Sequence, residues 1–162
     1  MEIGAERSPD THTDAALWDE IYPKLRRFAA VAADWDIDPD DLVQEVLARA
    51  LARGPLSDLD TPLAYLRRAI VNLVANERRR ASRQRLAFEH LHTDVERPAT
   101  YPSDLAILFE LSPLDRTILF MADVEGAPAR EIAGSVGLSE LAVRHRVSRA
   151  RKVLRRRVED QR

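Results

Sequence analysis

The chain has 162 residues, 45% of them hydrophobic, which is enough for one domain or two small ones with packed cores. It contains no cysteine, so disulfide bonds and thiolate metal sites are excluded. No apolar run reaches the length of a membrane span, and the first residues, MEIGAERSPDTHT, lack the apolar core of a signal peptide. We therefore expect a soluble, cytoplasmic protein with no membrane insertion.

Charge is unevenly distributed along the chain. Residues 1–60 carry a net charge of −8, residues 61–97 carry +4 and residues 98–162 carry +2. The segment Val143–Val158 holds eight Lys and Arg residues and no acidic one, although the whole chain has a net charge of −2. This segregation predicts two kinds of partner, one basic and one acidic.

The first predicted element is an amphipathic helix that follows a polar lead. Residues 1–13 are expected to be disordered. From Leu17 to Ala32 apolar residues recur at steps of three and four, as on the buried face of a helix. Pro23 lies inside this pattern, so we expect it to bend the helix or to begin a new turn.

Two more helices are predicted before residue 86. Asp38 is a suitable N-cap and Pro39 a suitable first residue for the second helix, which is expected to end at Gly54. The third helix should start at Thr61-Pro62 and continue into the arginines around residues 78–85. Together with the first helix they would form one small helical domain, residues 14–85.

Residues 86–102 have two prolines and no sustained apolar period, which indicates a flexible linker. Beyond it, residues 103–162 predict a second small helical domain. Its expected elements are a short helix from Ser103, a helix from the cap Ser112-Pro113 to Gly126, a helix from Pro128 to Val136, and a last helix capped by Ser139. No convincing alternating strand is found. The predicted fold class is therefore all-α, with two small helical domains.

The last two helices have the spacing of a helix-turn-helix. Ile132, Val136, Val143 and Val147 are placed to pack them together, and Gly137 suits a left-handed helix end. In such a motif the second helix enters the DNA major groove with its N-terminus first. Candidates for base edges are Glu140, Arg144, His145 and Arg149; candidates for phosphates are Arg146, Arg151, Lys152 and Arg155–Arg157. The alternative is a solvated basic helix end, which would explain the last turn only.

The second predicted helix, DPDDLVQEVLARAL, has a different character. It places Asp40, Asp41, Gln44 and Glu45 beside an apolar stripe. An acidic, amide-bearing face repels DNA and suits a basic protein surface. An ordinary solvated helix face is the alternative.

Several stretches together resemble the extracytoplasmic-function (ECF) group of bacterial sigma factors. YPKLRRFA, DPDDLVQEVLARAL and TPLAYLRRAIVNLVANERRR are similar to sigma region 2. LSPLDRTILFMADVEGAPAREIAGSVGLSELAVRHRVSRARKVLR is similar to region 4. The resemblance implies a non-enzymatic subunit that binds core RNA polymerase, recognises the −10 and −35 promoter elements and opens the DNA, without a cofactor. It also implies a cognate anti-sigma factor as a partner.

The resemblance also implies roles for individual residues. The residues that match the motif docking on the clamp helices of the largest polymerase subunit are Asp41, Gln44 and Glu45. The residues expected at the −10 element are Tyr65, Arg68, Asn72, Arg79, Arg80 and Arg83, with Arg67 and Arg78 as further phosphate contacts. The loop Arg53–Asp60 matches one that receives a flipped-out base. Arg144, Arg146 and Arg149 match the −35 pattern. Departures from the family pattern are Asn76, Leu141-Ala142 and His145.

The sequence allows two alternatives to a sigma factor. A stand-alone helix-turn-helix regulator would use the same basic helix without polymerase. His90, His92 and Asp94 could in principle hold a metal ion, but they lie in an irregular segment without the spacing of a metal-binding helix. No nucleophile with a base and no phosphate-binding glycine loop is found. We expect no metal site and no catalytic activity.

Overall fold

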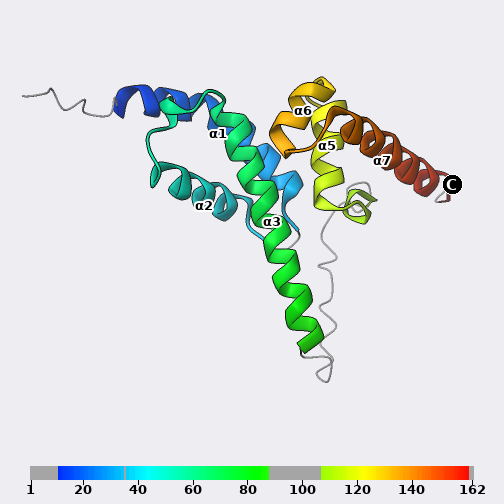
Figure 1. Ribbon diagram of the computed structural model, residues 1–162. Helices are drawn as coiled ribbons and strands as arrows, with labels where there is room; N and C mark the ends of the chain where they lie inside the picture. The colour runs from blue at the N-terminus through cyan, green and yellow to red at the C-terminus, as the bar shows by residue number, and fades with distance from the viewer. Residues whose placement is uncertain (1–10, 35, 88–106, 161–162) are drawn as a thin grey trace, which may run out of the picture.

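The computed structural model describes residues 11–34, 36–87 and 107–160, and within these ranges every regular element is helical. The helices are α1 (Thr11–Ala32), α2 (Pro39–Leu51), η1 (Leu56–Asp58), α3 (Pro62–Ala87), η2 (Ile107–Glu110), α5 (Pro113–Asp123), α6 (Ala129–Val136) and α7 (Glu140–Asp160). Figure 1 shows α1, α2 and α3 on one side of the molecule and α5, α6 and α7 on the other. The predicted all-α class is confirmed.

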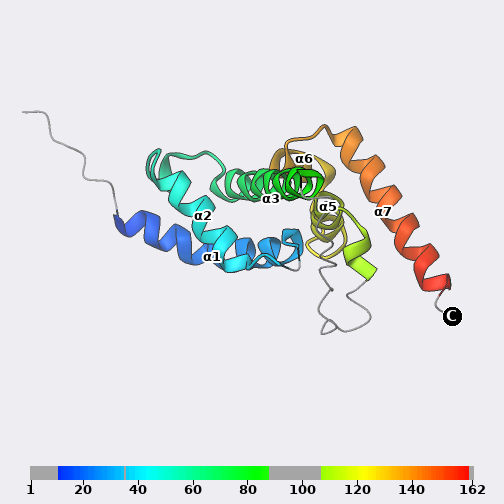
Figure 2. The same cartoon turned by 90° about the horizontal axis from the view of Figure 1, so that it is seen from below.

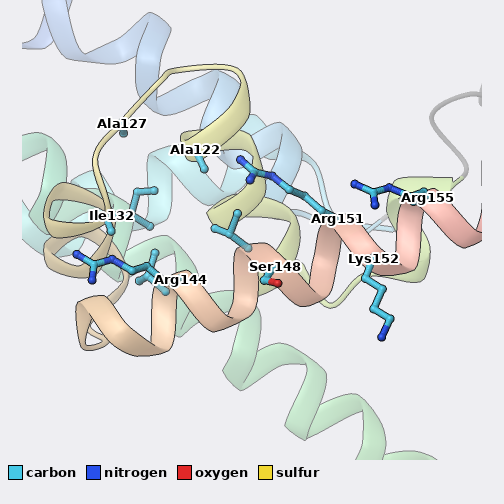
Figure 3. A pocket seen from close by; sticks show the side chains of 11 residues that line it. Ala122, Ala127, Ile132, Arg144, Ser148, Arg151, Lys152 and Arg155 are labelled. Carbon is cyan, nitrogen blue, oxygen red and sulfur yellow. The ribbon is translucent and has the colours of Figure 1, made fainter.

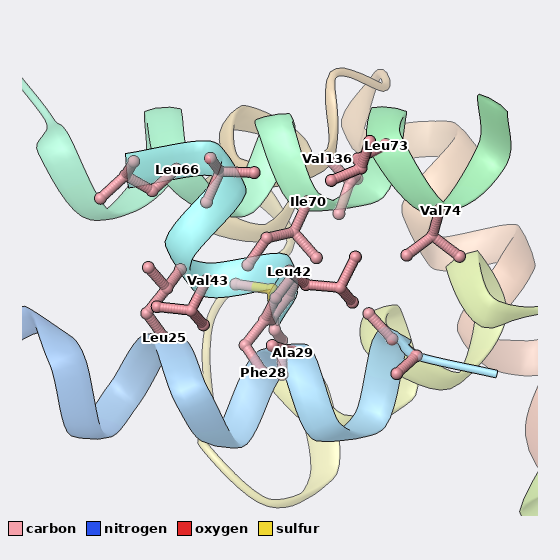
Figure 4. Close-up of a cluster of buried hydrophobic side chains, with 14 of the residues drawn as sticks. Leu25, Phe28, Ala29, Leu42, Val43, Leu66, Ile70, Leu73, Val74 and Val136 are labelled. Atoms are coloured by element: carbon pink, nitrogen blue, oxygen red, sulfur yellow. The ribbon is translucent and has the colours of Figure 1, made fainter. Parts of the chain in front are cut away.

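Helices α1, α2 and α3 pack around an apolar core. Figure 4 shows Leu25 and Phe28 of α1, Val43 of α2 and Ile70 of α3 pointing toward one another. All four are almost fully buried. On α1 the buried Ile21, Leu25 and Phe28 follow one another at steps of four and three, which is why the apolar period predicts this face correctly.

The predicted start of α2 is confirmed, but two predicted boundaries are wrong. The Asp38 side chain accepts a hydrogen bond from the Asp40 N–H at 2.8 Å, and Pro39 occupies the first turn. Helix α2 ends at Leu51, three residues before Gly54. Residues 11–13, expected in the disordered lead, are helical and form the first turn of α1. Helix α1 contains Pro23 without ending there.

The C-terminal helices have the capping that their sequences predict. Ser112 accepts from the Asp115 N–H at 3.1 Å, and Ser139 accepts from the Ala142 N–H at 3.2 Å. Gly137 ends α6 with φ of 73°, a left-handed conformation that glycine adopts without steric cost. The turn therefore places α7 across α5 and α6 as a helix-turn-helix. Of the short helix expected from Ser103, the described part is the single turn η2.

The two sets of helices share one continuous core. Ile118 and Met121 of α5 belong to the same buried cluster as Phe28 and Ile70, and Val136 of α6 packs beside Leu73 of α3. Figure 2 shows α5 and α6 lying against α1 and α3. The sequence pattern predicts two modules but not this contact between them.

A buried arginine lies at the centre of the contact. Arg116 of α5 is only 4% exposed, and its guanidinium donates to the carbonyl oxygens of Val31 at 3.0 Å and Ala33 at 2.8 Å. It also donates to the Asp34 carboxylate at 3.2 Å. These acceptors lie at the C-terminal end of α1, where the helix dipole favours a cation. Arg116 thus caps α1 from the other half of the chain.

A second buried arginine bridges the halves nearby. Arg67 of α3 is 3% exposed, donates to both Glu125 oxygens at 2.7 and 2.9 Å, and lies over the Phe28 ring. Arg67 was expected to contact a DNA phosphate. That prediction is wrong for this conformation, because the side chain is covered and already paired with a carboxylate.

Candidate nucleic-acid interface and polymerase-binding face

Helix α7 presents an exposed, basic outer face. Val143 is buried against the rest of the helix-turn-helix, and Val147 packs beside it. The base-edge candidates Glu140, Arg144, His145 and Arg149 are all exposed, as predicted. Arg144 donates to Glu140 at 3.1 Å, one turn earlier. This pair holds the guanidinium beside the N-terminal turn of the helix, which is the part that a helix-turn-helix inserts into the major groove.

A groove of about 720 Å³ runs between α7 and the connection from α5 to α6, and we call it the basic groove. Ala127 and Ile132 line one wall, and the other is lined by Arg144, Ser148, Arg151, Lys152 and Arg155 (Figure 3). Four cationic side chains on one wall of an open groove favour an anionic partner. A nucleic-acid backbone is such a partner, and arginine can pair with phosphate in a bidentate manner.

Not every arginine of α7 is available for DNA. Arg146 is half-buried and donates to Asp115 at 2.7 Å, whereas Arg151 pairs with Asp123 through two hydrogen bonds. The Asp123 carboxylate raises the pKa of Arg151 above its usual value. Arg157 also has an acidic partner, Glu110. These pairs fix α7 to the helices before it, so the basic segment serves the fold as well as any ligand.

The −10 candidates lie along one long helix, α3. Asn72, Arg79, Arg80 and Arg83 are exposed, and Tyr65 is half-buried at the edge of the core. Arg68 has another partner in this conformation, because its guanidinium donates to the Gly134 carbonyl of α6 at 2.7 Å. Five of the six −10 candidates therefore lie on or beside the free surface of α3. The sixth, Arg68, is bonded to the C-terminal half of the chain.

The loop Arg53–Asp60 lies at the N-terminal end of α3. Leu56 is buried in the core, while Ser57, Asp58 and Asp60 are exposed. The Arg53 guanidinium donates to the Tyr65 hydroxyl at 2.5 Å. Tyr65 and the loop are thus neighbours, as a joint role in binding one strand would require.

The acidic residues of α2 separate into two groups. Asp40 faces α1, where Arg26 contacts both of its carboxylate oxygens at 2.8 and 3.1 Å. Hydrogen bonding to Arg26 holds the pKa of Asp40 below its usual value. Asp40 is therefore part of the packing of α2 on α1.

The exposed residues of α2 form a separate surface. Asp41, Gln44 and Glu45 lie at steps of three and one on the side away from the core, and all are exposed. Glu45 pairs with Arg49 one turn later, at 2.6 Å. We call these three residues the acidic face. An exposed ion pair at this spacing is weak, so a basic partner can displace it at small cost.

The other predicted features are outside the described ranges or absent from them. His90, His92, Asp94 and Trp35 lie outside the described residues. Among residues 11–34, 36–87 and 107–160 there is no group of His, Cys, Asp and Glu side chains suited to a metal ion. None of the helices in these ranges is long and apolar enough to cross a membrane.

Sequence reasoning missed two residues that the fold depends on. Asp14 bonds to the backbone of the loop Arg53–Asp60, and Arg116 joins the two halves. Their partners lie more than 40 residues away in the chain, and no local period marks them. The only sequence signal for Arg116 is its position just before the apolar stretch ILFM.

Comparisons with known proteins agree with this geometry. The family model described as Sigma-70, region 4 matches residues 105–154. A curated relative, ECF RNA polymerase sigma factor SigE of Mycolicibacterium smegmatis, is 30% identical over 156 residues, covering 85% of this chain. The chain spans 60% of that relative's length. Among solved structures, the sigma factor RpoE crystallised with the anti-sigma factor NepR, from Bartonella quintana, shares the fold with a TM-score of 0.70 at 23% identity. That alignment covers 91% of this chain and 98% of RpoE.

Proposed function

We propose that the chain is a member of the ECF group of bacterial sigma factors, binds core RNA polymerase and directs transcription initiation at specific promoters; its similarity to sigma region 4 and to SigE supports this. The observation that carries this proposal is the combination of three surfaces in one chain. The acidic face of α2 suits a basic protein surface. The outer face of α3 suits single-stranded DNA, and α7 with the basic groove suits duplex DNA. A simple regulator needs only the last of these.

The proposed division of labour follows the elements. Asp41, Gln44 and Glu45 dock on the clamp helices of the largest polymerase subunit. Helix α3 and the loop Arg53–Asp60 engage the −10 element. Helix α7 reads the −35 element in the major groove, where the exposed side chains of its first turns reach base edges. The protein itself performs no catalysis and uses no cofactor, since the polymerase supplies the chemistry.

DNA opening is the step in which α3 would do most. Exposing a base means unstacking and unpairing it, at a cost of a few kcal/mol. A protein offsets this cost by binding the single strand better than the duplex, through phosphate contacts and aromatic stacking. The exposed Arg79, Arg80 and Arg83 supply the first kind of contact and Tyr65 the second, while the Asn72 amide can both donate and accept.

Arg68 can join this set only after a rearrangement. Its hydrogen bond to the Gly134 carbonyl must break before its guanidinium can contact a phosphate. If α6 moves away from α3 when this bond breaks, the side of α3 that α6 covers becomes exposed. A partner that holds the halves together would therefore oppose promoter binding. RpoE, the structural relative, was crystallised with an anti-sigma factor, and we propose a partner of that class for this chain.

The test is transcription in vitro with purified core polymerase and a promoter library. A fluorescent base analogue in the −10 element reports strand opening directly. We expect promoter-dependent strand opening when the chain is added to core polymerase. Core polymerase without the chain is the control and should give no such opening. If the chain binds duplex DNA but never raises the opening signal and does not bind core polymerase, the alternative applies, and the protein is a stand-alone helix-turn-helix regulator.

A further inference from the structure

The loop Arg53–Asp60 is tied to the first helix by one carboxylate. Asp14 of α1 accepts hydrogen bonds from the Leu56 N–H at 3.1 Å and from the Ser57 N–H at 2.9 Å. The two partners lie 42 and 43 residues further along the chain. Each carboxylate oxygen accepts one of the two hydrogen bonds, so the Asp14 side chain on α1 caps the first N–H groups of the turn η1. Pro55, the N-cap residue just before this turn, provides no side-chain cap of its own.

The charge state of Asp14 suits this role. Desolvation acts to raise the pKa of Asp14, but the hydrogen bonds from Ser57 and Leu56 outweigh it and hold the pKa below the usual value. The carboxylate is therefore ionised at neutral pH and accepts both bonds. Hydrogen bonds to an ionised acceptor are stronger than those between neutral groups.

The remaining backbone of the loop is also fixed. The Asp58 N–H donates to the Pro55 carbonyl at 3.2 Å, and the Leu59 N–H donates to the Leu56 carbonyl at 3.1 Å. Leu56 is 2% exposed and anchors the turn in the core. All four N–H groups from Leu56 to Leu59 are thus used within the protein. What the loop offers to a ligand is its exposed side chains, and their position depends on this backbone.

We propose that Asp14 is a positioning residue for base selection in the −10 element. By fixing the backbone of Leu56 and Ser57, it holds the exposed Ser57 and Asp58 side chains where a flipped-out base would be received. The inference rests on the proposed function, in which this loop receives that base. Asp14 acts through the loop and does not contact the DNA, because both of its oxygens are already bonded to backbone N–H groups.

Preorganisation is the physical reason for an effect on selection. A loop that is already ordered does not lose conformational freedom when the base enters, so correct contacts contribute fully to binding. Without Asp14 two N–H groups lose their acceptor and η1 loses its connection to α1. The loop then samples several positions, and contacts that distinguish one base from another are made only part of the time. Discrimination should fall more than total binding.

The experiment compares Asp14→Asn and Asp14→Glu with Asp19→Asn, a change of an exposed acid on the same helix. Asparagine keeps the shape but turns an N–H donor toward a backbone N–H, whereas glutamate keeps the charge. Holoenzyme containing each variant is tested on promoters that carry each of the four bases at every −10 position, with strand opening as the signal. Core polymerase affinity, −35 duplex affinity and the exchange rates of the Leu56 and Ser57 amide hydrogens are measured in parallel.

We expect Asp14→Asn to reduce base preference at one −10 position by roughly tenfold, the effect of losing a charge-assisted hydrogen bond. Amide exchange at Leu56 and Ser57 should accelerate, while core and −35 affinity stay unchanged. Asp14→Glu should restore part of the preference, and Asp19→Asn should have no effect. An unchanged preference in Asp14→Asn overturns the inference. So does an equal loss of opening for all four bases, which would mean that Asp14 only stabilises the fold. If wild-type holoenzyme opens no promoter, the proposed function fails and this inference fails with it.

Discussion

Individual arginines of α7 have different surroundings, and these predict different effects on DNA binding. Arg144 and Arg149 are exposed near the N-terminal half of the helix, where base edges are within reach. Arg156 is exposed near its C-terminal end. We expect Arg144→Ala and Arg149→Ala each to cost about 1–3 kcal/mol and to relax preference at one −35 position. Arg156→Ala should weaken all sequences alike and reduce the salt slope by about one.

Binding of each variant to a −35 library over a salt series separates the two classes. The Asp123 partner makes Arg151→Ala a useful comparison, because this change removes an ion pair within the protein as well as a charge on the groove. Arg151→Ala should therefore also lower the thermal stability of the free protein. If Arg144→Ala and Arg149→Ala both keep the wild-type base preference, the bases are read by other residues.

For single residues of α7, the sequence predicts well which side chains are exposed and predicts poorly which acidic residues they pair with. The spacing of Val143 and Val147 determines which side of α7 faces the core, so the outward direction of Arg144, His145 and Arg149 follows from periodicity. The pairing of Arg146 with Asp115 does not, because it depends on how α7 crosses α5. Arg146 matches the −35 pattern by position, and in the structure its side chain joins α7 to α5 through an ion pair with Asp115.

Among the elements, α2 gives the most direct test of polymerase binding. Its acidic face points away from the core, so a charge reversal there leaves the packing of Leu42, Val43 and Val46 intact. We expect Asp41→Lys with Glu45→Lys to weaken core polymerase binding by at least about tenfold, since like charges would then meet across the interface. Titration of the labelled protein with core polymerase measures the effect, and circular dichroism checks the fold.

The matched control reverses two exposed acids elsewhere. Asp19→Lys with Glu20→Lys makes the same change of net charge on α1. It should bind polymerase nearly as tightly as wild type. If both double variants lose the same affinity, net charge alone governs the association. If neither does, the docking surface is not on α2.

Helix starts are predicted better than helix ends, for a physical reason. A start is marked by a side chain that bonds to the backbone within three residues, as Asp38 and Ser112 do here. An end is decided by what the chain packs against next. Helix α2 stops before Gly54, and Leu56 just beyond it reaches the core. The start of α1 is an exception among the starts, since it lies before residue 14 and the Asp14 carboxylate is bonded to the distant turn η1. Neither contact is visible within a local window.

For the molecule as a whole, the helical periods and the segment 86–102 predict two helical modules, and the structure joins them through a shared core. Two buried arginines account for the difference. In a sequence, Arg67 and Arg116 look like surface residues, because arginine is rarely buried unless it is paired. Their partners, Glu125 and the carbonyl groups at the end of α1, become neighbours only once both halves are folded. The burial of these paired arginines is therefore the part of the fold that the local sequence pattern cannot predict.

This shared core predicts how the free protein unfolds. Two independent modules would give two thermal transitions, whereas one core spanning α1, α3, α5 and α6 should give one cooperative transition by calorimetry. Removing the guanidinium that caps α1 should uncouple the halves. We expect Arg116→Ala to lower the free energy of unfolding by about 3–5 kcal/mol, because the Asp34 carboxylate and the α1 carbonyl groups lose a buried partner.

The matched control is Arg26→Ala, which removes an exposed arginine that pairs with Asp40 within the N-terminal half. Exposed pairs contribute little to stability, so this variant should unfold in one transition close to that of wild type. In Arg116→Ala the transition should broaden or divide, with the half containing α5, α6 and α7 melting first because it has the smaller core. Two separate transitions in the wild-type protein, each unaffected by Arg116→Ala, would show that the halves fold independently and that their contact contributes little to stability.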